Sequence, residues 1–361
     1  MIPEADRRAR LTIPPLPVEE VPPGENAAID TMIATLKEQI RGRYKGTTAL
    51  RDAHPKHHGL VNALFTVEHD CPIELQHGLF QPSAQYKAQI RFSNGDPIIK
   101  HDLGMDLLGV GIKLSGVKES MLGDNHHDFL LATGKGFFGK DAVDFVDFPP
   151  AAGSKLKIIW YFIRGRRLRG GRQLMSAVRV PASPLAVEYF SQTPYRLGPH
   201  CVKYHLRPSR RRRSKGDPWY LKPGVRHLLS LLVSLPGSYL SKKVPGFNAL
   251  RDSLARDLRE TFVKLDFLIQ RWPDLSHLPL WAIEDPTRPW TAPWLKAATI
   301  YIYRQTDIRT RDEQAEHISF TPWRAHREHQ PLGGINRARL RIYSEMSAFR
   351  HGLNARPGPQ P

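Results

Sequence analysis

The chain has little cysteine and no long hydrophobic run. Cys71 and Cys201 are its two cysteines among 361 residues, which excludes a disulfide framework and a zinc motif of paired cysteines. The leucine-rich segment 228–235 is interrupted by two serines and is shorter than the roughly 20 residues that a membrane-spanning helix needs. Residues 1–24 are charged and rich in proline, so we expect an extended arm and not a signal peptide. Together these features favour a cytoplasmic protein.

Acidic residues are scarce relative to basic ones. The chain has 53 Lys and Arg against 35 Asp and Glu, a formal net charge of +18, which favours an anionic partner, cofactor or membrane surface. Arginines cluster at 164–172 and 210–213, but no recognised nucleic-acid module accompanies them, so we expect no nucleic-acid partner. The leucines of 228–235, flanked by cations, suit either contact with a lipid surface, peripheral to a membrane, or an ordinary buried helix.

The hydrophobic pattern predicts an α+β protein. Apolar residues spaced as on a helix follow Asn26, and alternating residues in 85–93 place Arg91 and Ser93 side by side on one face of a strand. The predicted helices cover 26–45, 137–168, 183–192 and 337–351, and the predicted strands cover 60–68, 85–93, 110–114, 128–132 and 298–304. We therefore expect strands early in the chain, a long helical insertion and one late strand.

The last predicted helix carries a polar stripe. Arg339, Tyr343, Met346 and Arg350 stand at i, i+4, i+7 and i+11 and so share one face. A guanidinium one turn from a phenol favours the phenolate, which is the form that binds ferric iron. The alternative is a solvated helix with Tyr343 packed in the core, which is the commoner fate of a tyrosine.

A second polar cluster precedes the first predicted strand. It contains Arg51, His54, Lys56 and two further histidines, and His54 is suited to acid–base work near neutral pH. Crowded histidines also bind metals or have purely structural roles. The spacing matches no zinc-hydrolase signature.

Several separated motifs together resemble the haem catalase superfamily, and in particular its short catalase-related haem peroxidases. The likeness extends over about residues 50–351. The motifs that carry it are Arg51-Asp52-Ala53-His54-Pro55-Lys56, Arg91-Phe92-Ser93, Phe137-Phe138 with Asp141 and Phe145, Ser191-Gln192-Thr193-Pro194-Tyr195-Arg196, Val202-Lys203-Tyr204, and Ala338-Arg339-Leu340-Arg341-Ile342-Tyr343. The resemblance implies an antiparallel β-barrel with helical insertions and a C-terminal proximal helix.

The resemblance also implies a role for each matching residue. His54 would be the distal acid–base histidine, and Ser93 the serine that orients it. Tyr343 would be the axial ligand of the haem iron, with Arg339 as its partner. Arg51, Arg91 and Arg350 would pair with the haem propionates, and Phe145 would stack near the haem on the distal side.

Two positions depart from the family pattern. The distal asparagine is replaced in the region of Ala132 and Thr133, and Thr133 is the candidate that partly takes over its role. The arginine of an arginine-glycine pair is replaced by Leu108, which precedes Gly109. Efficient dismutation of hydrogen peroxide is therefore less expected than in full catalases.

The resemblance implies a peroxidase or catalase-like oxidoreductase that contains haem b. It would reduce hydrogen peroxide or organic hydroperoxides, including those of lipids, through a ferryl intermediate, and would use an electron donor that the sequence does not identify. The alternatives are a haem- or lipid-binding protein with degenerate peroxide chemistry and a fatty-acid hydroperoxide isomerase of the allene oxide synthase type; assembly into a homo-oligomer also remains open. We expect a flexible arm at 1–25, a haem-binding domain at 26–351 and a disordered tail at 352–361.

Overall fold

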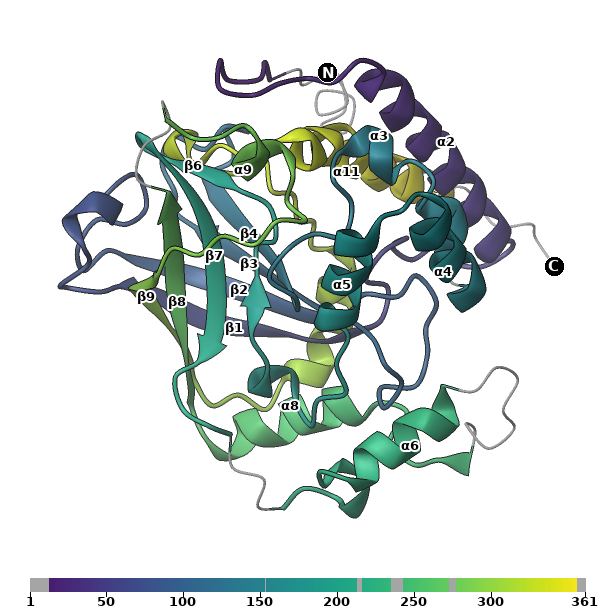
Figure 1. The fold of residues 1–361 in the computed structure, drawn as a ribbon. Coiled ribbons are helices and arrows are strands. Elements are labelled where there is room, and N and C mark those ends of the chain that lie inside the picture. The colour runs from purple at the N-terminus through teal and green to yellow at the C-terminus, as the bar shows by residue number, and fades with distance from the viewer. Residues whose placement is uncertain (1–12, 153, 213–215, 235–242, 273–276, 356–361) are drawn as a thin grey trace.

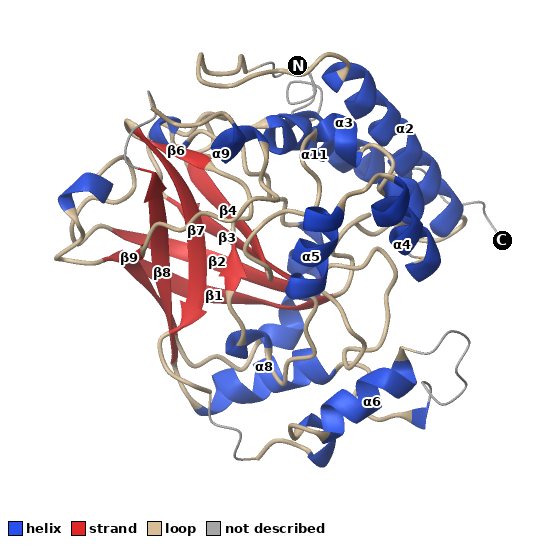
Figure 2. Cartoon of the chain, viewed as in Figure 1, coloured by secondary structure: helices blue, strands red, loops and turns tan. Residues whose placement is uncertain are grey.

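The computed structural model describes residues 13–152, 154–212, 216–234, 243–272 and 277–355 (Figure 1). Strands gather on one side of the molecule, and most of the helices lie on the other side or below it (Figure 2). None of the helices within these ranges is both long enough and apolar enough to cross a bilayer.

An antiparallel β-barrel forms the centre of the fold. The sheet has nine strands in the order β5-β4-β3-β2-β1-β9-β8-β7-β6, and β5 also pairs with β7, so eight strands close a ring while β6 flanks β7. The strands are β1 (His57–Val67), β2 (Gln85–Asn94), β3 (Leu108–Ser115), β4 (His126–Ala132), β5 (Tyr189–Phe190), β6 (Tyr195–Leu197), β7 (His200–Pro208), β8 (Val263–Trp272) and β9 (Trp294–Ile302). The predicted fold class, an antiparallel barrel with helical insertions, is confirmed.

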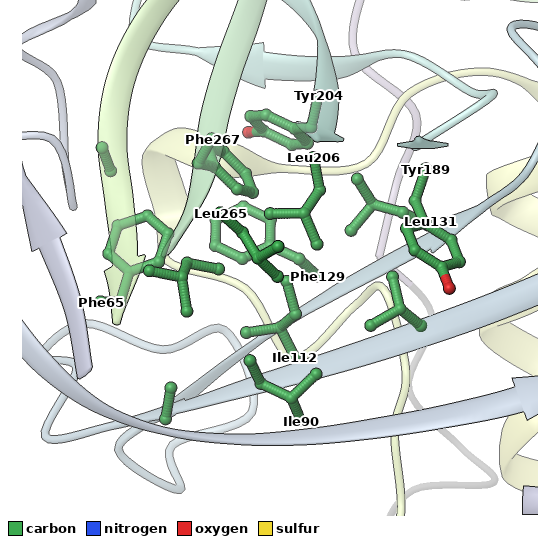
Figure 3. Packing of buried hydrophobic residues seen from close by; sticks show 14 of the residues in the cluster. Phe65, Ile90, Ile112, Phe129, Leu131, Tyr189, Tyr204, Leu206, Leu265 and Phe267 are labelled. Carbon is green, nitrogen blue, oxygen red and sulfur yellow. The ribbon is translucent and has the colours of Figure 1, made fainter. Parts of the chain in front are cut away.

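Aromatic rings fill the barrel interior. Phe65 lies 5.2 Å from Phe267 between ring centroids, and Phe129 lies 4.8 Å from Phe267 (Figure 3). Alternate residues of β2, such as Ile90 and Phe92, point into this core, which leaves Arg91 and Ser93 on the outer face. The catalytic candidates on β2 therefore lie outside the barrel core, toward the segments that precede and follow the barrel.

The early strands and the two long helices agree with the sequence predictions. The helix α2 (Glu25–Arg43) and the helix α11 (Gly334–Asn354) match predicted helices, and β1 to β4 match four predicted strands within three residues at each end. The predicted late strand starts four residues earlier than expected, at Trp294. Strong local periodicity accounts for these agreements.

Three predictions about the middle of the chain are wrong. The segment 183–192 is not a helix, because Phe190 pairs with Ala132 on one side and with His205 on the other and so closes the barrel. The segment 137–168 is not one helix, since Pro149 and Pro150 interrupt it. The expected long helical insertion contains β7 and β8, whose pairing with each other is set by the barrel.

Helices pack around the outside of the barrel. Along one side α2 packs against α11 and the short helix α3, while α8 lies below β1 (Figure 1). The remaining α-helices are α3 (Ala142–Phe145), α4 (Lys155–Arg164), α5 (Leu168–Ala177), α6 (Val225–Val233), α8 (Ala249–Glu260), α9 (Trp281–Glu284) and α10 (Asp312–His317). Short 3-10 helices span Ile73–Leu75, Pro149–Ala151, Pro184–Ala186, Trp219–Leu221, Ile308–Arg311 and Arg327–His329.

A buried ion-pair network fixes the start of α11. The Arg337 guanidinium donates to Glu25 at 2.8 Å, to Glu19 at 2.8 Å and to Glu284 at 2.9 Å, so one cation meets three carboxylates. Glu19 belongs to the predicted N-terminal arm, which thus contacts α11. The division of the chain into arm, domain and tail stays a prediction, and residues 1–12 and 356–361 of that arm and tail lie outside the described residues.

We predict that Arg337→Met destabilises the protein by about 3–5 kcal/mol, because three buried carboxylates lose their counter-charge. Arg341→Met, one turn later on the same helix, is the matched control. Its ion pair with Asp30 is exposed, so we expect a loss of less than about 1 kcal/mol. Urea unfolding measures both, and equal losses would contradict the assignment of the network as the anchor of α11.

Candidate functional site

His54 is held in an unusual backbone conformation just before β1. Its φ is 60°, in the left-handed region that residues other than glycine rarely adopt. The Arg91 guanidinium donates to the His54 carbonyl at 3.1 Å, and the Ser93 hydroxyl lies 3.1 Å from His54 Nδ1. Two outward-facing residues of β2 thus hold the backbone and the ring of one histidine.

The imidazole of His54 lies against the backbone of Gly109. A Cβ at position 109 would stand 2.4 Å from His54 Cε1 and 2.7 Å from Nδ1, so no side chain fits there. Gly109 pairs with Ser93 on one side and with Ala132 on the other. The glycine of the sequence motif is therefore required because the histidine packs directly on β3.

Ser93 sets the tautomer of His54. Its hydroxyl lies 3.4 Å from the Gly109 carbonyl, to which it donates its single proton. We therefore assign the Nδ1 of His54 as the donor to the Ser93 oxygen, which leaves Nε2 with its lone pair. The arrangement presents an imidazole base at Nε2.

Burial and positive charge keep His54 neutral. Desolvation, followed by the charges of Arg91, Arg51 and Arg339, lowers the pKa of His54 to about 4. Arg339 lies on α11, so its effect shows that the helix reaches the electrostatic neighbourhood of His54. At neutral pH the ring can accept a proton but carries no charge.

Three arginines meet beside His54 with one carboxylate among them. Arg91 and Arg350 lie 3.5 Å and 4.0 Å from the Glu316 carboxylate, and Arg51 donates to the Glu316 carbonyl at 3.1 Å. Arg51 precedes β1, Arg91 lies on β2 and Arg350 lies near the end of α11. The sequence predicted these three arginines, and the structure brings them together from three elements.

The cluster has more positive than negative charge. Burial lowers the pKa of Arg91 to about 10, and Glu316 only partly offsets it. Burial also lowers the pKa of Arg51 well below its usual value, and the charges of Arg91 and Arg350 add to that effect. The Nε of Arg51 is buried and has no hydrogen-bond partner among the residues that the structure describes. Three guanidinium groups around one carboxylate leave two positive charges in excess, a setting that suits a dianion.

Arg339, the first residue of the polar stripe on α11, forms its hydrogen bonds with residues other than Tyr343. Arg339 donates to Thr193 Oγ1 at 3.2 Å and to Asn336 Oδ1 at 3.3 Å, and lies 5.5 Å from the Phe137 ring centroid. Within the described ranges Arg339 forms no hydrogen bond to Tyr343. The predicted pairing of Arg339 with the phenol therefore stays a prediction.

Tyr343 is half-buried on α11. Its hydroxyl makes no hydrogen bond to any residue that the structure describes, so its oxygen keeps its full acceptor capacity. Burial raises the pKa of the neighbouring Tyr195, and the charges of Arg339 and Tyr343 also act on it. Tyr343 follows Arg339 by four residues on α11, so the two side chains lie on one face of the helix.

Thr133 and Phe145 have structural contacts in addition to any role at the site. The Thr133 hydroxyl accepts from the Leu108 N–H at 3.0 Å, which ties the end of β4 to β3. The Phe145 ring lies 5.1 Å from those of Phe137 and Phe148 and packs among apolar residues of α2 and α11. Their predicted roles beside a haem stay predictions.

Sequence reasoning gave no role to three residues of this region. Glu316 was not singled out, although it is the carboxylate of the arginine cluster. Phe320 packs on Gly111 as His54 packs on Gly109, since a Cβ at 111 would stand 3.0 Å from the ring. Gln192 donates to the Thr133 carbonyl at 3.1 Å. The alternating glycines of β3 were a usable signal for ring packing, but Glu316 had none because its partners come from distant segments.

The other histidines do not form a metal site. His58 is bonded to Asn94 at 2.9 Å, and burial lowers its pKa to about 4. No group of three or more His, Cys, Asp or Glu side chains in the described part of the chain is arranged to hold a metal ion. The metal-binding alternative for the cluster before β1 therefore receives no support.

We predict that His54 titrates near pH 4, and that Arg91→Met raises its pKa toward 6.5 because a nearby positive charge is removed. The unfolded chain binds this proton near pH 6.5 and the folded chain only near pH 4. The free energy of unfolding therefore falls as the pH drops through that window. Histidine-resolved NMR measures the titration, with Arg341→Met as the control for charge removed elsewhere. Titration of His54 near 6.5 in the unaltered chain would contradict its burial.

We also predict that Gly109→Ala displaces the His54 ring and costs about 1–3 kcal/mol of stability, because the new methyl group overlaps the imidazole. A crystal structure of the variant locates the ring, and thermal unfolding measures the loss. Gly42→Ala in α2 is the control, since a Cβ there meets nothing and should be neutral or stabilising. If the His54 imidazole does not move in Gly109→Ala, its contact with Gly109 does not fix the position of the ring.

The fold is similar to that of catalases. No protein-family model matches the chain, and no curated protein matches its sequence. Among solved structures, a fungal catalase superposes with a TM-score of 0.65 at 15% identity, over 96% of this chain and 67% of that one. A bacterial catalase gives 0.65 at 17% identity, over 97% and 65%.

Catalase A from Saccharomyces cerevisiae gives a TM-score of 0.62 at 15% identity, over 97% of this chain and 69% of that one. The chain thus spans about two thirds of the length of these catalases. The similarity establishes that this chain has a catalase-like fold.

Proposed function

We propose that the chain binds haem b between His54 and helix α11 and reduces hydrogen peroxide or organic hydroperoxides with electrons from an external donor. The observation that carries the proposal is the cluster of Arg51, Arg91 and Arg350 around Glu316. It joins the segment that holds His54 to the helix that holds Tyr343. The catalase-like fold supports the same conclusion.

The residues present fit a haem. Its two propionates match the two positive charges in excess at the arginine cluster, where the unpartnered Arg51 Nε offers a further donor. The Tyr343 oxygen, without a hydrogen bond to any described residue, would be free to bind the haem iron. Arg339, one turn away on the same helix, contributes positive charge on that side. When bound, haem would supply the iron at which the peroxide O–O bond is cleaved.

The chain's own contribution is proton transfer and positioning. The Nε2 of His54 accepts the proton of the hydroperoxide and returns it to the oxygen that leaves as alcohol or water. Ser93 keeps that nitrogen unprotonated beforehand, and Arg91 holds the backbone beneath the ring. The overall reaction consumes two electrons and two protons for each hydroperoxide and yields one alcohol, or water, and one further water.

A haem-binding protein without turnover is the second candidate. It is favoured by Thr133, whose hydroxyl is bonded to Leu108 where the resemblance leads one to expect an amide that orients peroxide. The two candidates differ in whether His54 affects turnover. Both candidates would use Tyr343 as the ligand of the haem iron.

We predict that the haem-loaded protein shows the absorption spectrum of a ferric tyrosinate, and that Tyr343→Phe abolishes it because the ligand oxygen is lost. Tyr303→Phe is the control, since that side chain is 56% exposed on the surface. His54→Ala should lower turnover by about 10²–10⁴-fold with hydrogen peroxide and with a fatty-acid hydroperoxide, measured with a dye donor.

His317→Ala, an exposed histidine, controls for the substitution itself. An unchanged spectrum in Tyr343→Phe would refute the ligand assignment. A tyrosinate spectrum with no turnover that depends on His54 would favour the binding protein over the enzyme.

A further inference from the structure

Helix α4 presents a complete apolar stripe to solvent. Leu156, Ile159, Trp160 and Ile163 stand at i, i+3, i+4 and i+7, so they share one face of the helix. Their exposed fractions are 76%, 53%, 65% and 63%. A stripe with this spacing in a globular protein normally faces the core.

The opposite face of α4 already makes the contacts with the rest of the protein. Tyr161 is 6% exposed, lies 5.3 Å from the Phe148 ring and donates to the Asp144 carbonyl at 3.1 Å. Phe162 packs in the same aromatic cluster. The exposed stripe therefore takes no part in attaching α4 to the rest of the protein.

The chain segment that carries the stripe is strongly cationic. The segment 154–180 contains eight Lys and Arg residues and no Asp or Glu. Two of the arginines have counter-charges, since Arg167 pairs with Asp144 and Arg169 with Asp285. The cations that are exposed on or beside α4 and α5 are Lys155, Lys157, Arg164, Arg166, Arg169 and Arg172.

Helix α6 also exposes apolar side chains. Leu228 and Leu231, three positions apart, are 63% and 59% exposed. Lys155 Nζ donates to the Ser234 carbonyl at 2.7 Å, which links the start of α4 to the end of α6. Exposed apolar side chains thus occur on two helices that this hydrogen bond links.

We propose that this α4 face, made of the four apolar residues and the six exposed cations on or beside α4 and α5, docks on the surface of an anionic phospholipid bilayer. An interfacial helix needs an apolar stripe that enters the acyl boundary and cations that meet lipid phosphates, and α4 has both on its exposed side. A second copy of this chain would bring a like-charged face against it. A nucleic acid would contact the cations but leave the apolar stripe of α4 in water.

The proposal is independent of the haem assignment. It concerns a surface outside the His54 region, and binding to a bilayer can be measured without a cofactor. If the proposed reaction with lipid hydroperoxides is also correct, docking would bring the protein to the phase that contains them.

The full chain should sediment with vesicles of equal parts phosphatidylcholine and phosphatidylglycerol, and not with vesicles of phosphatidylcholine alone. Ile159→Ser with Trp160→Ser should weaken binding at least about tenfold, because the inserted area is lost. Lys157→Gln, Arg164→Gln and Arg172→Gln together should weaken it by on the order of a hundredfold, about fivefold for each cation.

Two matched controls should bind like the unaltered chain. Ile73→Ser removes an apolar side chain that is 81% exposed elsewhere. Lys45→Gln, Lys87→Gln and Lys118→Gln together remove three exposed cations outside the face. Unchanged melting temperatures show that the α4 variants are folded.

Three outcomes overturn the proposal. Binding that the α4 variants and their controls lose equally would assign it to net charge alone. A fall in molecular mass of the variant with Ile159→Ser and Trp160→Ser in sedimentation velocity, without vesicle binding by the unaltered chain, would assign the stripe to a second copy. Binding to duplex DNA that depends on the α4 cations, again without vesicle binding, would assign the face to nucleic acid.

Discussion

The site depends on the meeting of three arginines and Glu316. Arg51 and Arg91 belong to the barrel end that holds His54, and Arg350 belongs to α11, so the cluster connects the two halves of the site. Buried cations repel each other, and burial lowers the pKa of each, with Glu316 offsetting only part of the cost. Such an excess of buried positive charge destabilises the fold unless an anion neutralises it, and this is the physical basis of the proposal that a ligand with two carboxylates binds here.

Helix α11 is fixed at both ends by charge. Arg337 at its start meets three carboxylates, and Arg350 near its end meets Glu316. Apolar contacts with α2 and the phenylalanine cluster hold the middle of the helix. The positions of Arg339 and Tyr343 are consequently set by the barrel and by the N-terminal segment together, because their helix cannot slide without breaking buried pairs.

On the barrel side, an unusual backbone conformation and close packing fix the position of His54. His54 keeps a left-handed backbone because Arg91 and Ser93 hold it from β2, and its ring rests on Gly109 because β3 has no side chain there. The result is a neutral, oriented imidazole on the outer surface of the barrel. The face proposed to dock lies on α4, whereas the proposed chemistry uses His54 and α11, so the two would use different side chains.

Period-two and helical spacing in the sequence were sufficient to predict β1 to β4, α2 and α11, and the spacing of Arg339, Tyr343 and Arg350 placed these residues on one helix. Family motifs named His54, Ser93 and the arginines. Only the tertiary structure decided that Phe190 closes the barrel, that Arg339 bonds to Thr193 and Asn336, and that Glu316 lies among the arginines. The reason is physical: a repeating pattern acts over one turn or one strand, whereas strand closure and buried charge pairing join residues that are far apart in the chain.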